Sequence, residues 1–236
     1  MRIFHQDVTA STNLDARNGI AGDVFVAEFQ TAGRGRLDHV WHAAKGLNLT
    51  FSVVLNVGEK EPSEVATLPL VVGLAVSDAV KEVLGKSAAL KWPNDVLVGG
   101  KKVCGILCER AANGVIAGIG VNVNQVEFPE EIRARATSIA LEKGAVVEKD
   151  EVLAAILRAL EVRHGAWARG GFGAVYEDFA AIDLLKGKKV AVFQTDGDEA
   201  PVEGVCGGVQ KDGTLLVGNE FICAGEAHIK SWGEEK

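Results

Sequence analysis

The order of apolar and polar positions predicts strands that alternate with a few helices. Alternating or continuous apolar runs at residues 24–29, 47–55, 89–92, 103–109 and 115–123 are typical of strands. Residues 64–84, which contain the most apolar stretch of the chain, predict a helix. A second helix is predicted after Asp150, where apolar residues recur at i, i+3, i+4 and i+7: Leu153, Ile156, Leu157 and Leu160. Ser11 and Thr12 carry hydroxyls typical of helix N-caps and indicate a short helix that ends at Gly19.

The pattern of apolar and polar residues changes after Lys186 and Gly187. Short β-rich runs at 190–193, 204–205, 215–217 and 221–222 are separated by Gly and Asp turns, as in a small all-β barrel or sandwich. About 50 residues lie near the lower size limit for independent stability, so we expect this part to pack on the larger one. The sequence therefore predicts one domain at residues 1–185 and a second at 186–236.

The most apolar stretch, residues 65–80, is interrupted by Thr67, Pro69, Gly73, Ser77 and Asp78. A membrane-spanning helix needs about 20 mainly apolar residues. We therefore expect a buried helix here and no membrane association.

Composition narrows the functional classes. With 236 residues, 47% of them hydrophobic, and a mean hydropathy of +0.14, the chain can bury a real core, which excludes disorder as its main state. Its net charge of −7 and pI of about 5.3 argue against a nucleic-acid or anionic-membrane surface, because phosphate contacts need clustered Lys and Arg. Residues 187–236, with five Lys and nine Asp or Glu, carry −4 of that charge.

Cysteine usage indicates a reduced compartment. Cys104, Cys108, Cys206 and Cys223 follow no disulfide-framework spacing, and residues 1–6 do not resemble a signal peptide, so we expect a cytoplasmic protein. Cys104 and Cys108 stand four apart in a predicted strand and would share one face. A metal pair there is an alternative that no second Cys pair or nearby His supports.

A Gly- and Arg-rich loop, residues 30–41, directly follows the strand predicted at 24–29. Gly33 and Gly35 let the backbone approach a ligand closely, while Arg34 and Arg36 offer planar donor forks suited to carboxylate or phosphate. The loop is typical of an anion site, although a plain solvated basic loop fits equally. An RGG-type nucleic-acid segment is disfavoured because the repeat occurs once.

Two later segments also carry candidate chemistry. Pro93 bars a central strand position and the following Asn94 and Asp95 favour a turn. Lys102 adjoins an apolar strand, where its ammonium either reaches over an enclosed pocket or snorkels to solvent. The Gly-spaced strand at 118–124 permits close approach of a ligand, or tight strand packing.

Taken together, these segments resemble the biotin protein ligases. The matching motifs, in the family's order, are Ser11-Thr12-Asn13, Gly33-Arg34-Gly35-Arg36 with Trp41, Lys91-Trp92-Pro93-Asn94-Asp95, Lys102 with Gly105-Ile106-Leu107, and residues 118–124. Each motif is weak alone, but five in register over about 115 residues are highly specific. The resemblance covers nearly the whole chain and begins within its first dozen residues, so we expect a monofunctional member without an N-terminal DNA-binding domain.

The resemblance implies a fold and a reaction. The fold is α/β of the α+β type: a mixed sheet with flanking helices, like the catalytic domain of class II aminoacyl-tRNA synthetases, followed by a small SH3-like C-terminal barrel. The reaction is that of an ATP-dependent biotin–[biotin carboxyl carrier protein] ligase. It joins biotin and ATP into biotinyl-5′-AMP, with Mg²⁺, and passes the biotinyl group to a lysine of a biotin carboxyl carrier protein.

The resemblance also implies residue roles. Biotin contacts fall on Ser11, Thr12, Asn13, Gln30, Gly33, Arg34, Gly35, Arg36, Lys102 and Gly105. Nucleotide contacts fall on Arg36, Trp41, Asn48, Lys91, Asn94 and Asn124. Lys102, Arg36 and Asp95 are the catalytic candidates, with Asp95 expected to contact Mg²⁺ or to orient an arginine.

Some expectations stay open at this point. His39 stands where family members often carry Arg, and a neutral imidazole would supply less charge to a phosphate, which would alter adenylate retention or the pH profile.

The family also implies a homodimer, and the missing DNA-binding domain implies no operator binding. A lipoate or octanoate ligase on the same fold and a non-catalytic biotin-binding module are the alternatives; the polar groups of Ser11, Thr12 and Gln30 favour a ureido ring over a lipoyl chain.

Overall fold

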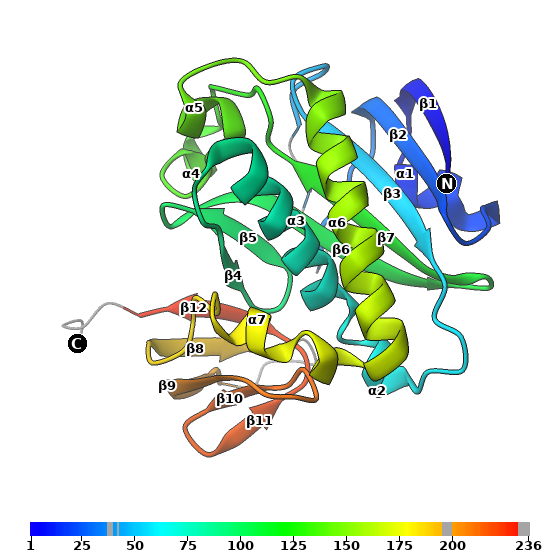
Figure 1. Cartoon of the computed structure of the whole chain (residues 1–236). Helices are drawn as coiled ribbons and strands as arrows, with labels where there is room; N and C mark the ends of the chain where they lie inside the picture. The colour runs from blue at the N-terminus through cyan, green and yellow to red at the C-terminus, as the bar shows by residue number, and fades with distance from the viewer. Residues whose placement is uncertain (37–39, 42, 195–199, 231–236) are drawn as a thin grey trace.

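The computed structural model describes residues 1–36, 40–41, 43–194 and 200–230. Its larger part is a seven-stranded sheet in the order β1-β2-β3-β7-β6-β5-β4 (Figure 1). The strands are β1 (Arg2–Thr9), β2 (Asp23–Gln30), β3 (Leu49–Leu55), β4 (Ala89–Lys91), β5 (Asp95–Val98), β6 (Lys101–Ala111) and β7 (Gly114–Val121). β1 and β2 run parallel and the other neighbours are antiparallel, so the predicted mixed sheet is confirmed.

Two long helices, α3 (Leu68–Leu84) and α6 (Lys149–Gly170), lie side by side over one face of this sheet (Figure 1). Short helices complete this part: α1 (Thr12–Asp15), α2 (Pro62–Val65), α4 (Glu130–Arg133), α5 (Ile139–Lys143) and α7 (Tyr176–Ala180). Residues 62–84, which include α2 and α3, are long and apolar enough to cross a membrane by length and composition, but 67% of their most apolar window is buried inside the protein. The buried helix expected from the sequence is therefore confirmed.

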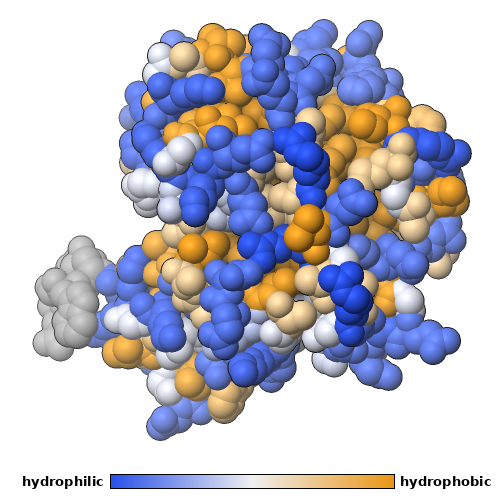
Figure 2. Space-filling model, viewed as in Figure 1, coloured by the Kyte–Doolittle hydropathy of each residue, from blue (hydrophilic) through white to orange (hydrophobic). Residues whose placement is uncertain are grey.

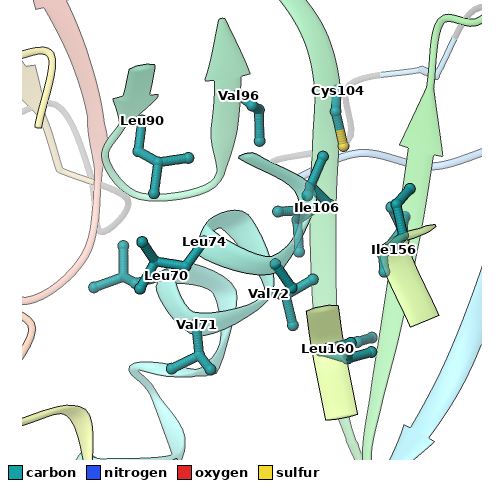
Figure 3. Packing of buried hydrophobic residues seen from close by; sticks show 14 of the residues in the cluster. Leu70, Val71, Val72, Leu74, Leu90, Val96, Cys104, Ile106, Ile156 and Leu160 are labelled. Carbon is teal, nitrogen blue, oxygen red and sulfur yellow. The ribbon is translucent and has the colours of Figure 1, made fainter. Parts of the chain in front are cut away.

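The core lies between these helices and the sheet. Leu70, Val72 and Leu74 of α3 pack against strand residues that include Ile106, and Ile156 and Leu160 of α6 close the layer (Figure 3). Because side chains alternate across a strand, burying Cys104 and Ile106 beneath the helices turns Gly105, Leu107 and Glu109 to the opposite face. That opposite face carries the candidate site.

A five-stranded antiparallel sheet follows, in the order β11-β10-β9-β8-β12 (Figure 1). Its strands are β8 (Lys189–Phe193), β9 (Val202–Val209), β10 (Leu215–Val217), β11 (Glu220–Ile222) and β12 (Glu226–Ile229). It packs on the larger part, where the buried Trp92 donates from Nε1 to Gly213 O at 3.1 Å. Hydrophilic side chains cover most of the molecular face seen in Figure 2, with apolar ones in patches over both parts.

Several boundaries differ from the sequence prediction. Strand β1 was not predicted, because Arg2 to Val8 are all exposed and show no burial period. Strand β12 was not predicted because Ala227 is the one buried residue among its four. The helix expected at Asp150 begins at Lys149, with Glu148 at its N-cap. Ser11 does occupy the N-cap of α1, but its side chain makes no capping hydrogen bond and Thr12 is already helical.

Candidate active site

A floor of small residues lies on the sheet face opposite α3 and α6. Strand pairing places Ser52 beside Gly118, and Gly120 beside both Thr50 and Gly105, so these residues share that face. A Cβ on Gly118 would lie 2.3 Å from Oδ1 of Asn13, and one on Gly120 would lie 2.4 Å from Cε2 of Trp41. The glycine spacing noted in the sequence therefore makes room for two protein side chains.

A polar network occupies the end of this floor near α1. The amide oxygen of Gln30 accepts from the backbone N–H of Thr12 at 2.8 Å, and its distance to Oγ1 of Thr12 is 3.1 Å. Oγ of the buried Ser52 lies 2.7 Å from Oγ1 of Thr12 and 2.6 Å from Oδ1 of Asn13. Nδ2 of Asn13 donates to Oε2 of Glu109 at 2.5 Å. Such a set of aligned donors and acceptors suits a small polar ring.

The Gly- and Arg-rich loop passes beside this network. Gly33 O accepts from the backbone N–H of Trp41 at 3.1 Å, and Arg34 pairs with Val40 in an isolated bridge, so the loop folds back on itself. Arg34 reaches Glu109, with Nη2 and Oε1 3.4 Å apart. The buried Ser11 side chain makes no hydrogen bond to a described residue, while Gly35 lies between the two arginines of the loop.

A cationic cluster lies at the other end of the floor. Nζ of Lys102 is 2.6 Å from Oδ1 of Asp95 and 5.9 Å from the centre of the Trp41 ring. Burial lowers the pKa of Arg36, and Asp95 and Glu226 oppose that change; Lys91 shows the same pattern, with its pKa lowered further by Lys102 and Arg135. The cationic cluster therefore contains four cations and two carboxylates in a partly buried space. The cations are Arg36, Lys91, Lys102 and Arg135, and the carboxylates are Asp95 and Glu226.

Such a cluster can hold an anion. Its positive excess would attract phosphate or carboxylate, and burial strengthens that attraction by limiting screening by water. One further donor lies at the site: Nε1 of Trp41 is buried and has no hydrogen-bond partner among the described residues. The Trp41 ring lies beside Gly105, Gly120 and Lys102, and thus separates the polar network from the cations.

Comparison with known proteins agrees with this geometry. The sequence pattern of the Biotin/lipoate A/B protein ligase family matches residues 6–125, about half of the chain. A biotin--[acetyl-CoA-carboxylase] ligase of Mycobacterium tuberculosis is 37% identical over 218 residues, which cover 89% of this chain and 80% of that protein. The chain belongs to the Biotin/lipoate A/B protein ligase family. The resemblance to biotin protein ligases stated from the motifs is confirmed.

Structures of this ligase family show the same fold. The biotin protein ligase from Aquifex aeolicus in complex with biotin and ATP superposes with a TM-score of 0.86 at 32% identity, covering 97% of this chain and 98% of that one. The bifunctional ligase/repressor BirA of Bacillus spizizenii is 36% identical over 185 residues, which cover 72% of this chain. The present chain spans 56% of that bifunctional relative, little more than half its length.

Three asparagines assigned to the nucleotide by the family resemblance are engaged within the protein. Nδ2 of Asn48 donates to Oε1 of Gln125 at 2.5 Å, and Nδ2 of Asn94 donates to Ile106 O at 2.8 Å. Asn124 both donates to Val147 O at 2.8 Å and accepts from its N–H at 2.9 Å. These amides hold the loops around the site, and their contact with nucleotide stays a prediction.

Sequence reasoning missed four residues that the structure brings to this site. They are Ser52, Glu109, Arg135 and Glu226. Ser52 had a signal, since it is a hydroxyl inside the otherwise apolar half of a strand, and Glu109 stood at the end of the Lys102 motif. Arg135 and Glu226 lie far along the chain and had none. The proposed departure at His39 lies outside the described residues.

The alternative of a cysteine metal site gains no support. Cys104 and Cys108 do share a strand face, as predicted, but all four cysteines are free thiols. Burial raises the pKa of the Cys108 thiol to about 12, so it stays protonated and a poor metal ligand. The part of the chain that the structure describes contains no group of three His, Cys, Asp or Glu residues able to hold a metal ion.

Proposed function

We propose that this chain is an ATP-dependent biotin–[biotin carboxyl carrier protein] ligase. One observation carries the proposal: the polar network around Asn13 and the cations around Lys102 lie at opposite ends of the same face of the sheet. Biotin has a ureido ring at one end and a carboxylate at the other, and it would lie along this floor with its carboxylate among the cations. ATP would place its phosphates at the same end.

The first step joins biotin and ATP. A carboxylate oxygen of biotin attacks the α-phosphorus, the bond to the β-phosphate oxygen breaks, and pyrophosphate leaves, which gives biotinyl-5′-AMP. Both reactants are anions, so the site must offset their repulsion and the charge that grows at phosphorus. Lys102 and Arg36 would supply that charge, while Asp95, 2.6 Å from Lys102, would hold the lysine in place.

The second step transfers the biotinyl group. The amine of a carrier lysine attacks the acyl carbon, AMP leaves, and an amide forms after the amine loses a proton. Arg36 is half-buried and donates from Nη1 to Gly225 O at 3.1 Å, so its guanidinium is already held at the edge of the cationic cluster. Such a held guanidinium would retain the reactive adenylate until the carrier arrives.

Magnesium fits this site only together with ATP. Mg²⁺ is usually held by one or two protein carboxylates and by substrate phosphates. Asp95 is the candidate ligand, since its Oδ2 makes no hydrogen bond to a described residue, whereas its Oδ1 is paired with Lys102. The metal would neutralise phosphate charge when bound.

Several finer features belong to the same proposal. We infer a class II aminoacyl-tRNA synthetase-like catalytic domain at 1–185, an SH3-like barrel at 186–236, and a cytoplasmic enzyme that binds no DNA. A homodimer is supported by the edge strand β1: among the described residues no strand pairs with its outer edge, and Ile3, Phe4 and Val8 are exposed there. Sedimentation of the full chain with and without biotin and ATP tests the dimer, and a DNA footprint tests the absence of DNA binding.

Two assays test the function. Pyrophosphate exchange into ATP should depend on biotin, and labelled biotin should become covalently attached to a purified biotin carboxyl carrier domain. Exchange driven by lipoate and not by biotin would replace the proposal with a lipoate ligase. Biotin binding without exchange or transfer would leave only a biotin-binding module.

A further inference from the structure

Glu109 lies on β6 where the polar network meets the arginine loop, and the family resemblance assigned it no role. Its carboxylate has two partners: Nδ2 of Asn13 at 2.5 Å and Nη2 of Arg34 at 3.4 Å. The Arg34 pair is long and the side chains of both partners are partly exposed, so water screens it. The short hydrogen bond to a nearly fully buried Asn13 is charge-assisted and is the stronger contact.

The network contains fewer hydroxyl protons than its contacts require. Oγ of Ser52 is within hydrogen-bond distance of both Oδ1 of Asn13 and Oγ1 of Thr12, but a serine carries one proton. Oδ1 of Asn13 can only accept, so the Ser52 proton lies toward Asn13. The Thr12 proton then has two acceptors within reach, Oγ of Ser52 at 2.7 Å and the amide oxygen of Gln30 at 3.1 Å. It lies toward Ser52, the shorter contact, because the Gln30 oxygen already accepts from the backbone N–H of Thr12.

The result is a chain of hydrogen bonds with one direction, from Thr12 to Ser52, from Ser52 to Asn13 and from Asn13 to Glu109. The carboxylate has only acceptor atoms, so turning the Asn13 amide over would bring its oxygen against that of Glu109. The opposite direction of the chain is therefore blocked at its Glu109 end. With a neutral side chain at this position, the direction would depend on the longer contact between Nδ2 of Asn13 and Leu107 O, at 3.4 Å.

We propose that Glu109 is a positioning residue that sets the donor and acceptor pattern of the biotin pocket. With its proton committed to Ser52, the Thr12 oxygen can only accept a further hydrogen bond. It therefore suits a ligand N–H, such as that of a cyclic urea, and disfavours a ligand carbonyl. This inference rests on the proposed biotin ligase function and names what selects the ureido ring.

The test is a double-mutant cycle on the full chain, with biotin binding measured by titration calorimetry and KM values by pyrophosphate exchange. E109Q should weaken biotin binding about 10-fold through loss of the charge-assisted bond and of the fixed direction. S52A should weaken it by a similar factor. The double variant should bind biotin no more weakly than whichever single variant binds it more weakly, because S52A already interrupts the chain of hydrogen bonds. KM for ATP should not change, and E161Q, an exposed charge on α6, is the matched control.

A second ligand keeps the test independent of the folding of S52A. A biotin analogue methylated on the ureido nitrogens lacks the donor, so it should bind wild type and E109Q equally weakly. Additive losses in the cycle, unchanged biotin binding by E109Q, or an equal rise in KM for ATP would each overturn the role of Glu109. Normal exchange by the wild type alongside any of these results leaves the ligase function standing, whereas a wild type that shows no biotin-dependent exchange removes that function itself.

Discussion

The two glycines of β7 should separate the biotin end of the site from the nucleotide end. Gly118 and Gly120 are neighbours on one strand face, yet a Cβ on the first meets Asn13 and a Cβ on the second meets Trp41. Neither glycine has a positive φ, so alanine is compatible with the backbone and its effect is the contact alone. Alanine at each position therefore perturbs one end of the site at a time.

The magnitude follows from the distances. A Cβ at position 120 would lie 2.4 Å from the indole, whereas ordinary contact begins near 3.4 Å, so Trp41 must retreat by about 1 Å. Overpacking of this kind costs about 1–3 kcal/mol in a core. Trp41 is only half-buried and can swing outward, so we expect the lower end, about 1 kcal/mol, or roughly a 5-fold rise in KM for ATP. Alanine at 118 presses on the more buried Asn13 and should raise KM for biotin by about 10-fold or more.

Pyrophosphate exchange measured against each substrate in turn is the assay, with thermal melts to show that both variants fold. The expected result is a crossed pattern: G118A changes KM for biotin and G120A changes KM for ATP. A common loss of kcat with both KM values unchanged, or the same KM affected by both variants, would refute the division of the floor.

Four further predictions follow from single side chains. K102A should lower the rate of adenylate formation at least 100-fold while the melting temperature stays near that of wild type, since charge builds beside Lys102 in the transition state; near-normal exchange would remove it from the mechanism. R36G should release adenylate, which labelling of bystander lysines by labelled biotin would detect, whereas labelling confined to the carrier would contradict it. Ellman's reagent should modify one thiol quickly in the native protein, the exposed Cys223, and C223S should abolish that phase. Burial lowers the pKa of His164 below its ordinary 6.5, so as the pH falls the imidazole takes up a proton in the unfolded chain before it does so in the folded protein. The free energy of unfolding should therefore decrease as the pH falls below about 6.5, and the melting temperature of H164F should decrease less than that of wild type.

Most of the sheet and the two long helices could be predicted because their apolar residues form continuous or periodic runs along the chain. The runs that became β3, β6 and β7 are apolar on at least one face, and α3 is apolar almost all round. Strand β1 could not be predicted, because an exposed edge strand leaves no pattern in the sequence.

The candidate site was predicted only at residues that stand in local sequence motifs. Lys102, Arg36 and Asp95 stood in recognisable motifs, and the structure brings them to one cluster. Ser52 and Glu109 depend on strand register, which places them beside Asn13 from two different strands, and no local pattern encodes such a pairing. Glu226 comes from the second sheet and required the packing of the two sheets to be known.

The hydrogen bond from Arg36 to Gly225 O joins residues that are 189 positions apart. During synthesis the arginine loop leaves the ribosome long before its acceptor exists, and a chain that stops before Gly225 has the loop without that partner. A polypeptide interrupted at any earlier point therefore lacks the contact that holds the guanidinium. The segment that leads into β12 is therefore needed at the site: the guanidinium expected to retain a reactive acyl-adenylate is held by this hydrogen bond only after nearly the whole chain has been synthesised.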